Sequence, residues 1–153
     1  MRRLFEVDLK DYEGCTKVFR RPSARAIIFK DDKIALVYAT NEKYYKFPGG
    51  GIHDDEDKKK ALIREVKEEV GLVVIPESIT EYGSVLRRQK SDRDEDTVFE
   101  QENYYYFCKV EDIAESSNLM IMRKMPVLCW LMLILMKLSK STVNIRVIYS
   151  LMR

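Results

Sequence analysis

Three glutamates stand close together directly after a run of three glycines. Glu65, Glu68 and Glu69 are spaced three, one and four residues apart, so they share one side of any helix that carries them. Like charges at such spacing repel by a few tenths of a kcal/mol per pair, and a bound divalent cation would reverse that cost. Hard cations such as Mg²⁺ prefer carboxylate oxygens. The pattern indicates a divalent metal held beside a phosphate, and the ordinary alternative is a solvated helix face.

The glutamates are predicted to lie on a helix from Asp55 to Val70. Acidic residues at its start suit a helix N-terminus, and Gly71 follows its last periodic residue as a C-terminal stop. At about 100° per residue, four apolar residues form a core-facing stripe, and the glutamates occupy the neighbouring arc. The stripe consists of Leu62, Ile63, Val66 and Val70.

The flanking segments read as strands and loops. Residues 24–40 predict a hairpin with its turn at residues 30–33, and residues 41–51 predict a loop with a tight glycine turn. Residues 72–88 predict two strands separated by a turn at Pro76, and residues 98–110 predict another strand. The charged segment between these last strands predicts a loop.

Composition favours one domain of ordinary type. The chain has 153 residues, 46% hydrophobic and 34% charged, which is enough for a real core. Its start turns polar after six residues, unlike a secretory leader, so we expect a cytoplasmic protein. Cys15, Cys108 and Cys129 are odd in number and form no CxxC pair, which predicts reduced cysteines and no thiolate zinc site. His53 is the single histidine and is interpreted as a loop residue, so metal chemistry here must rest on carboxylates.

Charge and texture change abruptly near residue 116. All 25 acidic and 21 of the 27 basic residues lie in residues 1–115, which carry −4, whereas residues 116–153 carry +6. This balance does not suggest a nucleic acid polymer as partner. Six of the seven methionines lie in residues 116–153, where there is neither Asp, Glu nor Gly. The apolar run 125–136 has 12 residues, short of the roughly 20 that a membrane span needs.

Two hypotheses account for this tail. One is a buried or partner-binding helix rich in methionine. The other is translation out of frame, because an Asp codon GAT followed by G reads as ATG, the Met codon, when shifted by one base. From Leu119 onward, permitted codons in the neighbouring frame recover a sequence that resembles a strand and an acidic helix.

The full spacing around the glutamates resembles the Nudix box of the MutT-like Nudix hydrolase superfamily. Within residues 50–72, every position of that box is matched, and residues 47–51 (FPGGG) resemble the approach to it. The matched positions are Gly50, Glu56, Arg64, Glu65, Val66, Glu68, Glu69, Gly71 and Leu72. The resemblance implies an α/β fold, a Nudix-type α/β/α sandwich with a mixed β-sheet in which the box forms a loop, helix and loop. It also implies Mg²⁺-dependent or Mn²⁺-dependent hydrolysis of a pyrophosphate bond.

The resemblance also assigns roles. Glu65, Glu68 and Glu69 are the expected metal ligands and catalytic groups, with the Gly50 carbonyl as a further ligand; Glu65 is alternatively the base. Arg64 is the expected orienting catalytic residue, ion-paired to a carboxylate such as Glu56. A further acid on a distant strand is expected in many members of the superfamily. The candidates here are Glu100 and Glu102, with Asp94 and Glu95 behind them.

The substrate class implied is a small nucleoside diphosphate linked to another group, such as a nucleoside triphosphate, ADP-ribose or a nucleotide sugar. Gly49, Gly50 and Gly51 with Arg25 and Tyr45 are the candidate substrate-binding residues. One cation among Arg20, Arg21, Arg25 and Lys46 is expected to contact phosphate. Tyr44 and Tyr45 either stack on a base or pack in the core. A homodimer is compatible with the sequence, and the alternative function is a non-catalytic nucleotide-sensing or partner-binding domain of the same fold.

Overall fold

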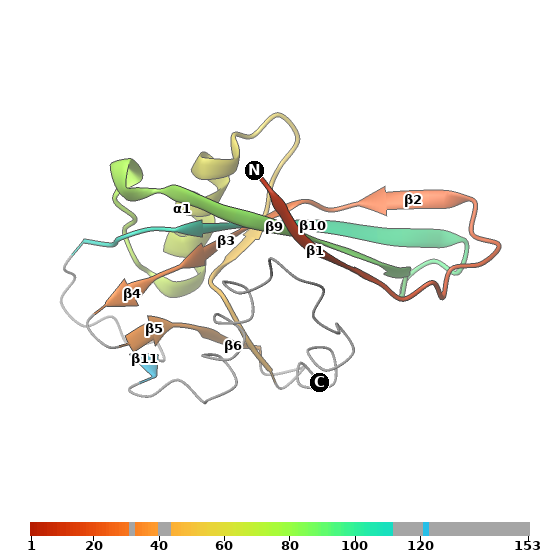
Figure 1. The fold of residues 1–153 in the computed structure, drawn as a ribbon, viewed down its shortest axis with the longest axis horizontal. Helices are drawn as coiled ribbons and strands as arrows, with labels where there is room; N and C mark the ends of the chain where they lie inside the picture. The colour runs from red at the N-terminus through yellow and green to blue at the C-terminus, as the bar shows by residue number, and fades with distance from the viewer. Residues whose placement is uncertain (31–32, 40–43, 112–120, 123–153) are drawn as a thin grey trace.

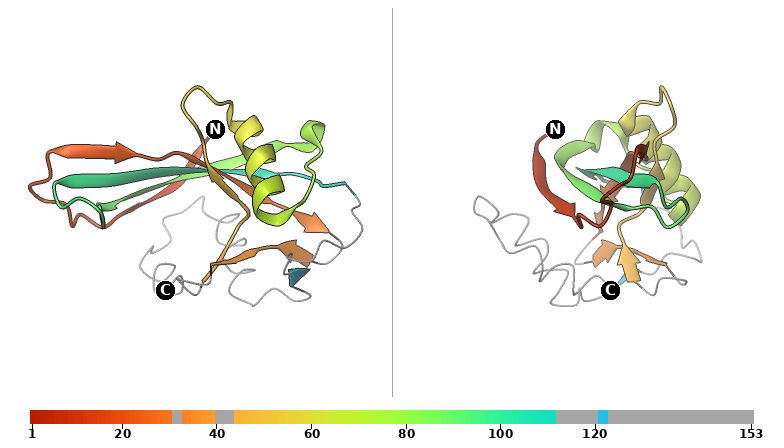
Figure 2. Two further views of the ribbon diagram at one scale, coloured as in Figure 1. Left: turned by 180° about the vertical axis from the view of Figure 1, so that it is seen from behind. Right: turned by 90° about the vertical axis from the view of Figure 1, so that its right-hand side faces the viewer.

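The computed structural model describes residues 1–30, 33–39, 44–111 and 121–122. Within them the chain forms a six-stranded mixed sheet, two small antiparallel sheets and one α-helix. The helix covers one face of the large sheet, and β4, β5 and β6 lie beyond its other face (Figures 1 and 2). The apolar run predicted at 125–136 lies outside these residues, and no helix among those described is long and apolar enough to cross a membrane.

The large sheet has the order β1-β9-β10-β3-β8, with β2 also paired to β10. Its strands are β1 (Arg3–Asp8), β2 (Lys17–Arg20), β3 (Ser23–Ile27), β8 (Gly49–Gly51), β9 (Thr80–Lys90) and β10 (Thr97–Phe107). Three pairs are parallel, namely β1 with β9 and β10 with β2 and β3, and two are antiparallel. The sheet is therefore mixed, as the sequence predicted. Strands β1 and β2, which were not predicted, help to extend β9 and β10 into an arm beyond the helix (Figure 1).

The predicted hairpin at residues 24–40 is confirmed in a modified form. Strands β4 (Phe29–Lys30) and β5 (Lys33–Ala35) pair antiparallel across the predicted turn, and β5 also pairs with β11 (Ile121–Met122). The first predicted strand is split, because β3 joins the large sheet while β4 belongs to the small one. A third small pair joins β6 (Val37–Ala39) to β7 (Tyr44–Lys46).

The predicted loop at residues 41–51 is wrong in part. Residues 44–46 form β7, and the three glycines form β8, the edge strand that pairs antiparallel with β3. Glycine here allows strands β8 and β3 to approach closely and does not make a turn, because a Cβ on Gly49 would collide with the Ala24 carbonyl. The φ of Gly49 is also +130°, which favours glycine. The glycines are thus fixed by pairing with β3.

Helix α1 (Lys58–Val70) begins later than the predicted Asp55. Asp57 is the N-cap and its carboxylate accepts from the backbone N–H groups of Lys59 and Lys60, whereas Asp55 has a φ of +62°, outside the helical region. The predicted C-terminal stop is confirmed, since Gly71 has a φ of +70° and its N–H donates to the Lys67 carbonyl.

The segment after the helix departs from the predicted two strands. Only a single bridge, Val74 to Val110, precedes a short 3-10 helix, η1 (Pro76–Ser78), which makes the predicted turn. Strand β9 then follows, and the predicted charged loop connects it to β10.

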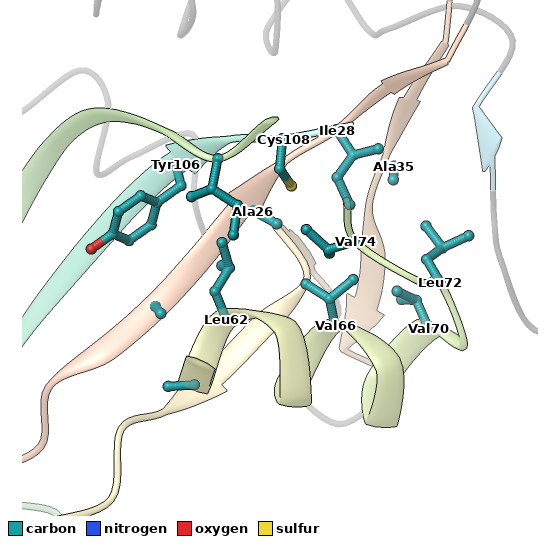
Figure 3. Packing of buried hydrophobic residues seen from close by; sticks show 13 residues of the cluster. Ala26, Ile28, Ala35, Leu62, Val66, Val70, Leu72, Val74, Tyr106 and Cys108 are labelled. Atoms are coloured by element: carbon teal, nitrogen blue, oxygen red, sulfur yellow. The ribbon is translucent and has the colours of Figure 1, made fainter. Parts of the chain in front are cut away.

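The core fills the space between α1 and the large sheet. Leu62, Val66 and Val70 point from the helix toward β3 and β10, as the predicted stripe requires (Figure 3). Ile63, which the sequence assigned to the stripe, is only partly buried, whereas Ala61, which was not assigned to it, is completely buried. On β3 the residues facing the helix are Ala24 and Ala26, both 0% exposed, so the helix approaches this strand closely.

The cysteines in the described residues, Cys15 and Cys108, are free, as predicted. Burial raises the pKa of the Cys108 thiol to about 12. Cys129 lies outside the described residues.

Replacing Leu62 by Ala should test this core. Leu62 is completely buried in the helix–sheet interface, and removing a buried leucine side chain leaves a cavity that costs about 2–5 kcal/mol. Urea unfolding followed by circular dichroism should show that loss, whereas Lys60→Ala on the exposed face of the same helix should stay within about 0.5 kcal/mol of wild type. Equal effects of the two substitutions would contradict the assigned packing.

Candidate functional site

Two of the three glutamates lie on the part of α1 that meets β8. The side chains of Glu65 and Glu69 are 20% and 22% exposed, whereas that of Glu68 is 61% exposed. A spacing of four residues stacks Glu65 and Glu69 on one helix face. The structure therefore separates the predicted trio into an inner pair and an outer member.

The inner pair reaches the backbone of β8 because that strand has no side chains. The N–H of Gly49 donates to Oε2 of Glu69 at 2.9 Å. A Cβ on Gly50 would collide with the carboxylate of Glu65, whose Oε1 would be only 2.9 Å away. The carboxylate of Glu65 thus fills the space that a side chain on Gly50 would take. Gly51 is different, since the nearest atom to its Cβ position is Nε of Arg21 at 3.8 Å.

Arg64 ties the helix to the segment before it. Its guanidinium donates to both carboxylate oxygens of Glu56, from Nε at 2.9 Å and from Nη2 at 2.8 Å. It also donates from Nη1 to Glu65 at 2.7 Å and from Nη2 to the Gly51 carbonyl at 3.1 Å. Glu68 shares Nη1 at 3.4 Å. The predicted ion pair between Arg64 and Glu56 is confirmed, and a planar guanidinium suits this fork geometry.

These contacts perturb the acid–base properties of the pair. Hydrogen bonds from Arg64, and then from the His53 backbone N–H, lower the pKa of Glu56 from 4.5 to about 2. The reciprocal hydrogen bonds to Glu56 and Glu65 raise the pKa of Arg64. His53 is exposed and its backbone N–H donates to Oε2 of Glu56, in agreement with its interpretation as a loop residue.

Each candidate phosphate-binding cation has a distinct environment. Arg25 donates to the carbonyls of Gly49 and Phe47, Arg20 pairs with Glu100 at 3.1 Å, and Lys46 pairs with Glu69 at 2.6 Å. Arg21 is exposed beside Gly51. Arg25 is therefore a residue that fixes the course of β8. The pairing of Lys46 with a predicted metal ligand was not foreseen, although its place three residues before Gly49 was the signal available.

The aromatic candidates divide between packing and exposure. On β10, Tyr105 lies edge-on to Phe47, Phe107 contacts Tyr82, and Tyr104 packs against the helix-side core, so these three aromatic side chains serve packing. Tyr44 is partly buried, whereas Tyr45 is 40% exposed on β7 and does not belong to the core.

The candidate distant acids are engaged within the sheet. Glu100 accepts from Arg88 at 2.8 Å and from Arg20, and these hydrogen bonds lower its pKa despite partial burial. For Glu102, burial acts to raise the pKa but is outweighed by hydrogen bonds from Ser84 and Arg3, so its pKa is lowered. Asp94 binds the backbone of Asp96 and the Thr97 hydroxyl. In the described part of the chain, these contacts are with β1, β2, β9 and adjoining residues and not with the glutamates of α1.

The donor set suits a hard cation, although its three carboxylates are not gathered. Among residues 1–30, 33–39, 44–111 and 121–122, no group of three His, Cys, Asp or Glu side chains is placed to hold a metal ion. Glu65 and Glu68 are held by Arg64, and Glu69 by Lys46. The carboxylate oxygens of Glu65 lie where a side chain on residue 50 would be. Oxygen donors of this kind nevertheless fit Mg²⁺ or Mn²⁺, which prefer such ligands and retain several waters.

Comparison with known proteins identifies the family. Residues 19–119 match the model of the NUDIX domain, and since this is 101 of the 153 residues, the chain belongs to the NUDIX domain family. The mixed sheet with its helix confirms the α/β part of the α/β/α sandwich predicted from the sequence. A second helical layer is not found in the part of the chain that the structure describes.

The chain matches only part of the length of each of three individual relatives. The chain is 35% identical over 71 residues to an ADP-ribose pyrophosphatase of Methanocaldococcus jannaschii, covering 43% of this chain and 40% of that relative. A MutT/nudix family protein from Enterococcus faecalis has a TM-score of 0.51 and 18% identity, over 67% of this chain and 42% of that one. An ADP-ribose pyrophosphatase from Streptococcus suis has a TM-score of 0.43 and 26% identity, over 65% and 68% respectively. The match to the first relative spans less than half of its length.

The lowered pKa of Glu56 should make stability depend on pH. With a folded pKa of about 2 against an ordinary 4.5, the unfolded chain takes up the proton first, so stabilisation by this carboxylate is complete above pH 4.5 and is lost as the pH falls toward 2. In urea unfolding, the advantage of wild type over Glu56→Gln should shrink through that window. An advantage that stays constant down to pH 2 would contradict the ion pair.

Two neighbouring glycines offer a matched test of the helix–strand contact. Gly50→Ala should force the Glu65 carboxylate away from β8 and disturb its hydrogen bond with Arg64, because the new methyl group occupies the same space. Gly51→Ala meets only Arg21 at ordinary contact distance. Because the displaced group is the end of a flexible side chain, the expected cost is about that of the lost hydrogen bond, and Gly50→Ala should lower the free energy of unfolding in urea by about 1 kcal/mol more than Gly51→Ala. Equal stability of the two variants would show that Glu65 does not occupy that space.

Proposed function

We propose that this chain is a pyrophosphohydrolase that cleaves a nucleoside diphosphate linked to another group, with ADP-ribose as the first substrate to test. The observation that carries the proposal is the placement of Glu65 and Glu69 against the side-chain-free backbone of β8. Membership of the NUDIX domain family supports it, and the Methanocaldococcus jannaschii relative suggests ADP-ribose. Nucleoside triphosphates and nucleotide sugars are the other substrates of this class.

The residues that would hold Mg²⁺ or Mn²⁺ are Glu65, Glu69 and the Gly50 carbonyl, with Glu68 joining from the exposed side of the helix. When bound, such an ion neutralises phosphate charge and activates water for attack at phosphorus. Arg64 acts as a positioning residue, since its fork on Glu56 fixes the guanidinium that orients Glu65. In the alternative assignment, Glu65 is the general base that activates water and is not a metal ligand. Glu100 and Glu102 are less suited to that role because arginine and serine donors already engage them.

Substrate contacts are assigned to the strand that the glutamates face. Gly49, Gly50 and Gly51 stay the candidate substrate-binding residues, and of the three Gly51 has the room for a phosphate to approach the backbone, since the nearest atom to its Cβ position is Nε of Arg21 at 3.8 Å. Arg25 supports this strand by holding the Gly49 carbonyl. We therefore give Arg25 a positioning role in place of direct contact with phosphate. Tyr45, exposed on β7, is the candidate for stacking on a base. A cytoplasmic location and a homodimer remain predictions.

Glutamine substitutions test the proposal directly. Glu65→Gln and Glu69→Gln keep size and polarity but remove the charge, so kcat for AMP release from ADP-ribose with Mg²⁺ should fall by about 100-fold or more. Glu77→Gln, on the exposed η1 turn, is the control and should retain wild-type activity. Circular dichroism should be unchanged in all three. Undiminished kcat in both inner variants would overturn the assignment.

A substrate screen decides between this function and its alternative. Phosphate-containing products should appear from at least one nucleoside diphosphate derivative in the presence of Mg²⁺, and EDTA should abolish their release. Nucleotide binding without turnover of any of them would instead favour the non-catalytic sensing domain of the same fold.

We also propose that residues 1–153 correspond to a single Nudix domain whose sequence from about Leu119 onward is read out of frame. The match to the NUDIX domain model ends at residue 119, next to the loss of every acidic residue after position 115. Reading the gene in all three frames tests this proposal, and the intact mass of the native protein provides a second measurement. A native mass that agrees with the printed 153 residues would overturn it.

A further inference from the structure

Glu69 is held on both of its carboxylate oxygens by the segment that leads into the glycine strand. Oε1 is 2.6 Å from the ammonium of Lys46, and Oε2 accepts from the Gly49 N–H at 2.9 Å. The two side chains are only 30% and 22% exposed, so this ion pair is partly shielded from water. The contact links the end of α1 to β7 and β8.

The ammonium of Lys46 can move while the backbone of this residue stays in place. Lys46 belongs to β7, where it is paired in register with Val37 of β6, so its backbone is anchored. Its ammonium stands at the end of a flexible four-carbon stem and is a compact point charge. The ion pair can therefore break and form again without moving the strand.

Two other cations beside β8, Arg64 and Arg25, lack this freedom. Arg64 retains Glu56 and the Gly51 carbonyl whatever happens at Glu65. Arg25 is bound to backbone carbonyls, which are not predicted metal ligands. Lys46 differs because the ion-pair partner found for it in the described part of the chain is Glu69, a carboxylate assigned to the metal.

We propose that Lys46 exchanges partners during the reaction cycle: a divalent cation takes Glu69 from it, and its released ammonium then binds a phosphate of the substrate. This inference rests on the proposed function. A divalent cation and an ammonium on one carboxylate oxygen repel each other strongly at such short range. A diphosphate brought to the metal would supply the anion that the ammonium has lost.

The first test measures metal binding without nucleotide. Isothermal titration with Mn²⁺ should show about tenfold tighter binding to Lys46→Gln than to wild type, because the competing ammonium is gone. Lys67→Gln, the same charge change on the exposed face of α1, is the matched control and should bind as wild type does. Unchanged or weaker binding by Lys46→Gln, or equal tightening in both variants, would overturn the exchange. Thermal melting in EDTA verifies that each variant is folded.

The second test concerns the substrate. At saturating Mg²⁺, Lys46→Gln should raise KM for ADP-ribose about tenfold, and Lys46→Arg should restore most of the loss because it keeps the charge. An unchanged KM together with tighter Mn²⁺ binding would overturn the phosphate contact and leave only the exchange at Glu69. Failure of wild type to hydrolyse any nucleotide would instead overturn the proposed function, and the Mn²⁺ titration would still test the exchange.

Discussion

The site depends on one steric condition: the backbone of β8 and the side chains of α1 share a space that no side chain of β8 occupies. Gly49 pairs so closely with β3 that a Cβ would strike the Ala24 carbonyl, and at Gly50 that space belongs to the Glu65 carboxylate. Small residues on β3 allow the helix to lie near the sheet in the first place, since Ala24 and Ala26 are its helix-facing residues. Because protein interiors are closely packed, the carboxylates of α1 can reach backbone groups only because β8 carries no side chains and β3 carries small ones.

Electrostatics then decides how the glutamates are held. Each of four carboxylates is paired with one of two cations: Glu56, Glu65 and Glu68 with Arg64, and Glu69 with Lys46. Arg64 is fixed by a fork on Glu56 whose low pKa keeps the acid ionised. Lys46 is a point charge on a flexible stem. One cation therefore holds the geometry through a two-point contact, and the other holds Glu69 through a single flexible side chain.

The long strands have a different role from the site. Strands β9 and β10 continue past the helix into an arm with β1 and β2, where Arg20 and Arg88 neutralise Glu100. These ion pairs are partly exposed and are expected to contribute little to stability singly. Their effect on chemistry is to occupy the acids that the sequence left as candidates for a distant base, which concentrates the catalytic assignment on α1.

The sequence alone determined the core stripe of the helix, because the stripe depends on residue types at fixed spacing along one element. The resemblance of residues 50–72 to the Nudix box supplied the family, the mixed α/β fold and the pairing of Arg64 with Glu56. The sequence misplaced the helix start, since the four residues 54–57 are all acidic and only backbone conformation selects Asp57 as the cap. It interpreted the glycines as a loop because pairing of β8 with β3 joins residues more than 20 positions apart. Tertiary structure alone separated Glu68 from Glu65 and Glu69, bound Arg25 to carbonyls and brought Lys46 to Glu69. Those outcomes follow from which groups meet across elements, and spacing within a single element carries no information about such meetings.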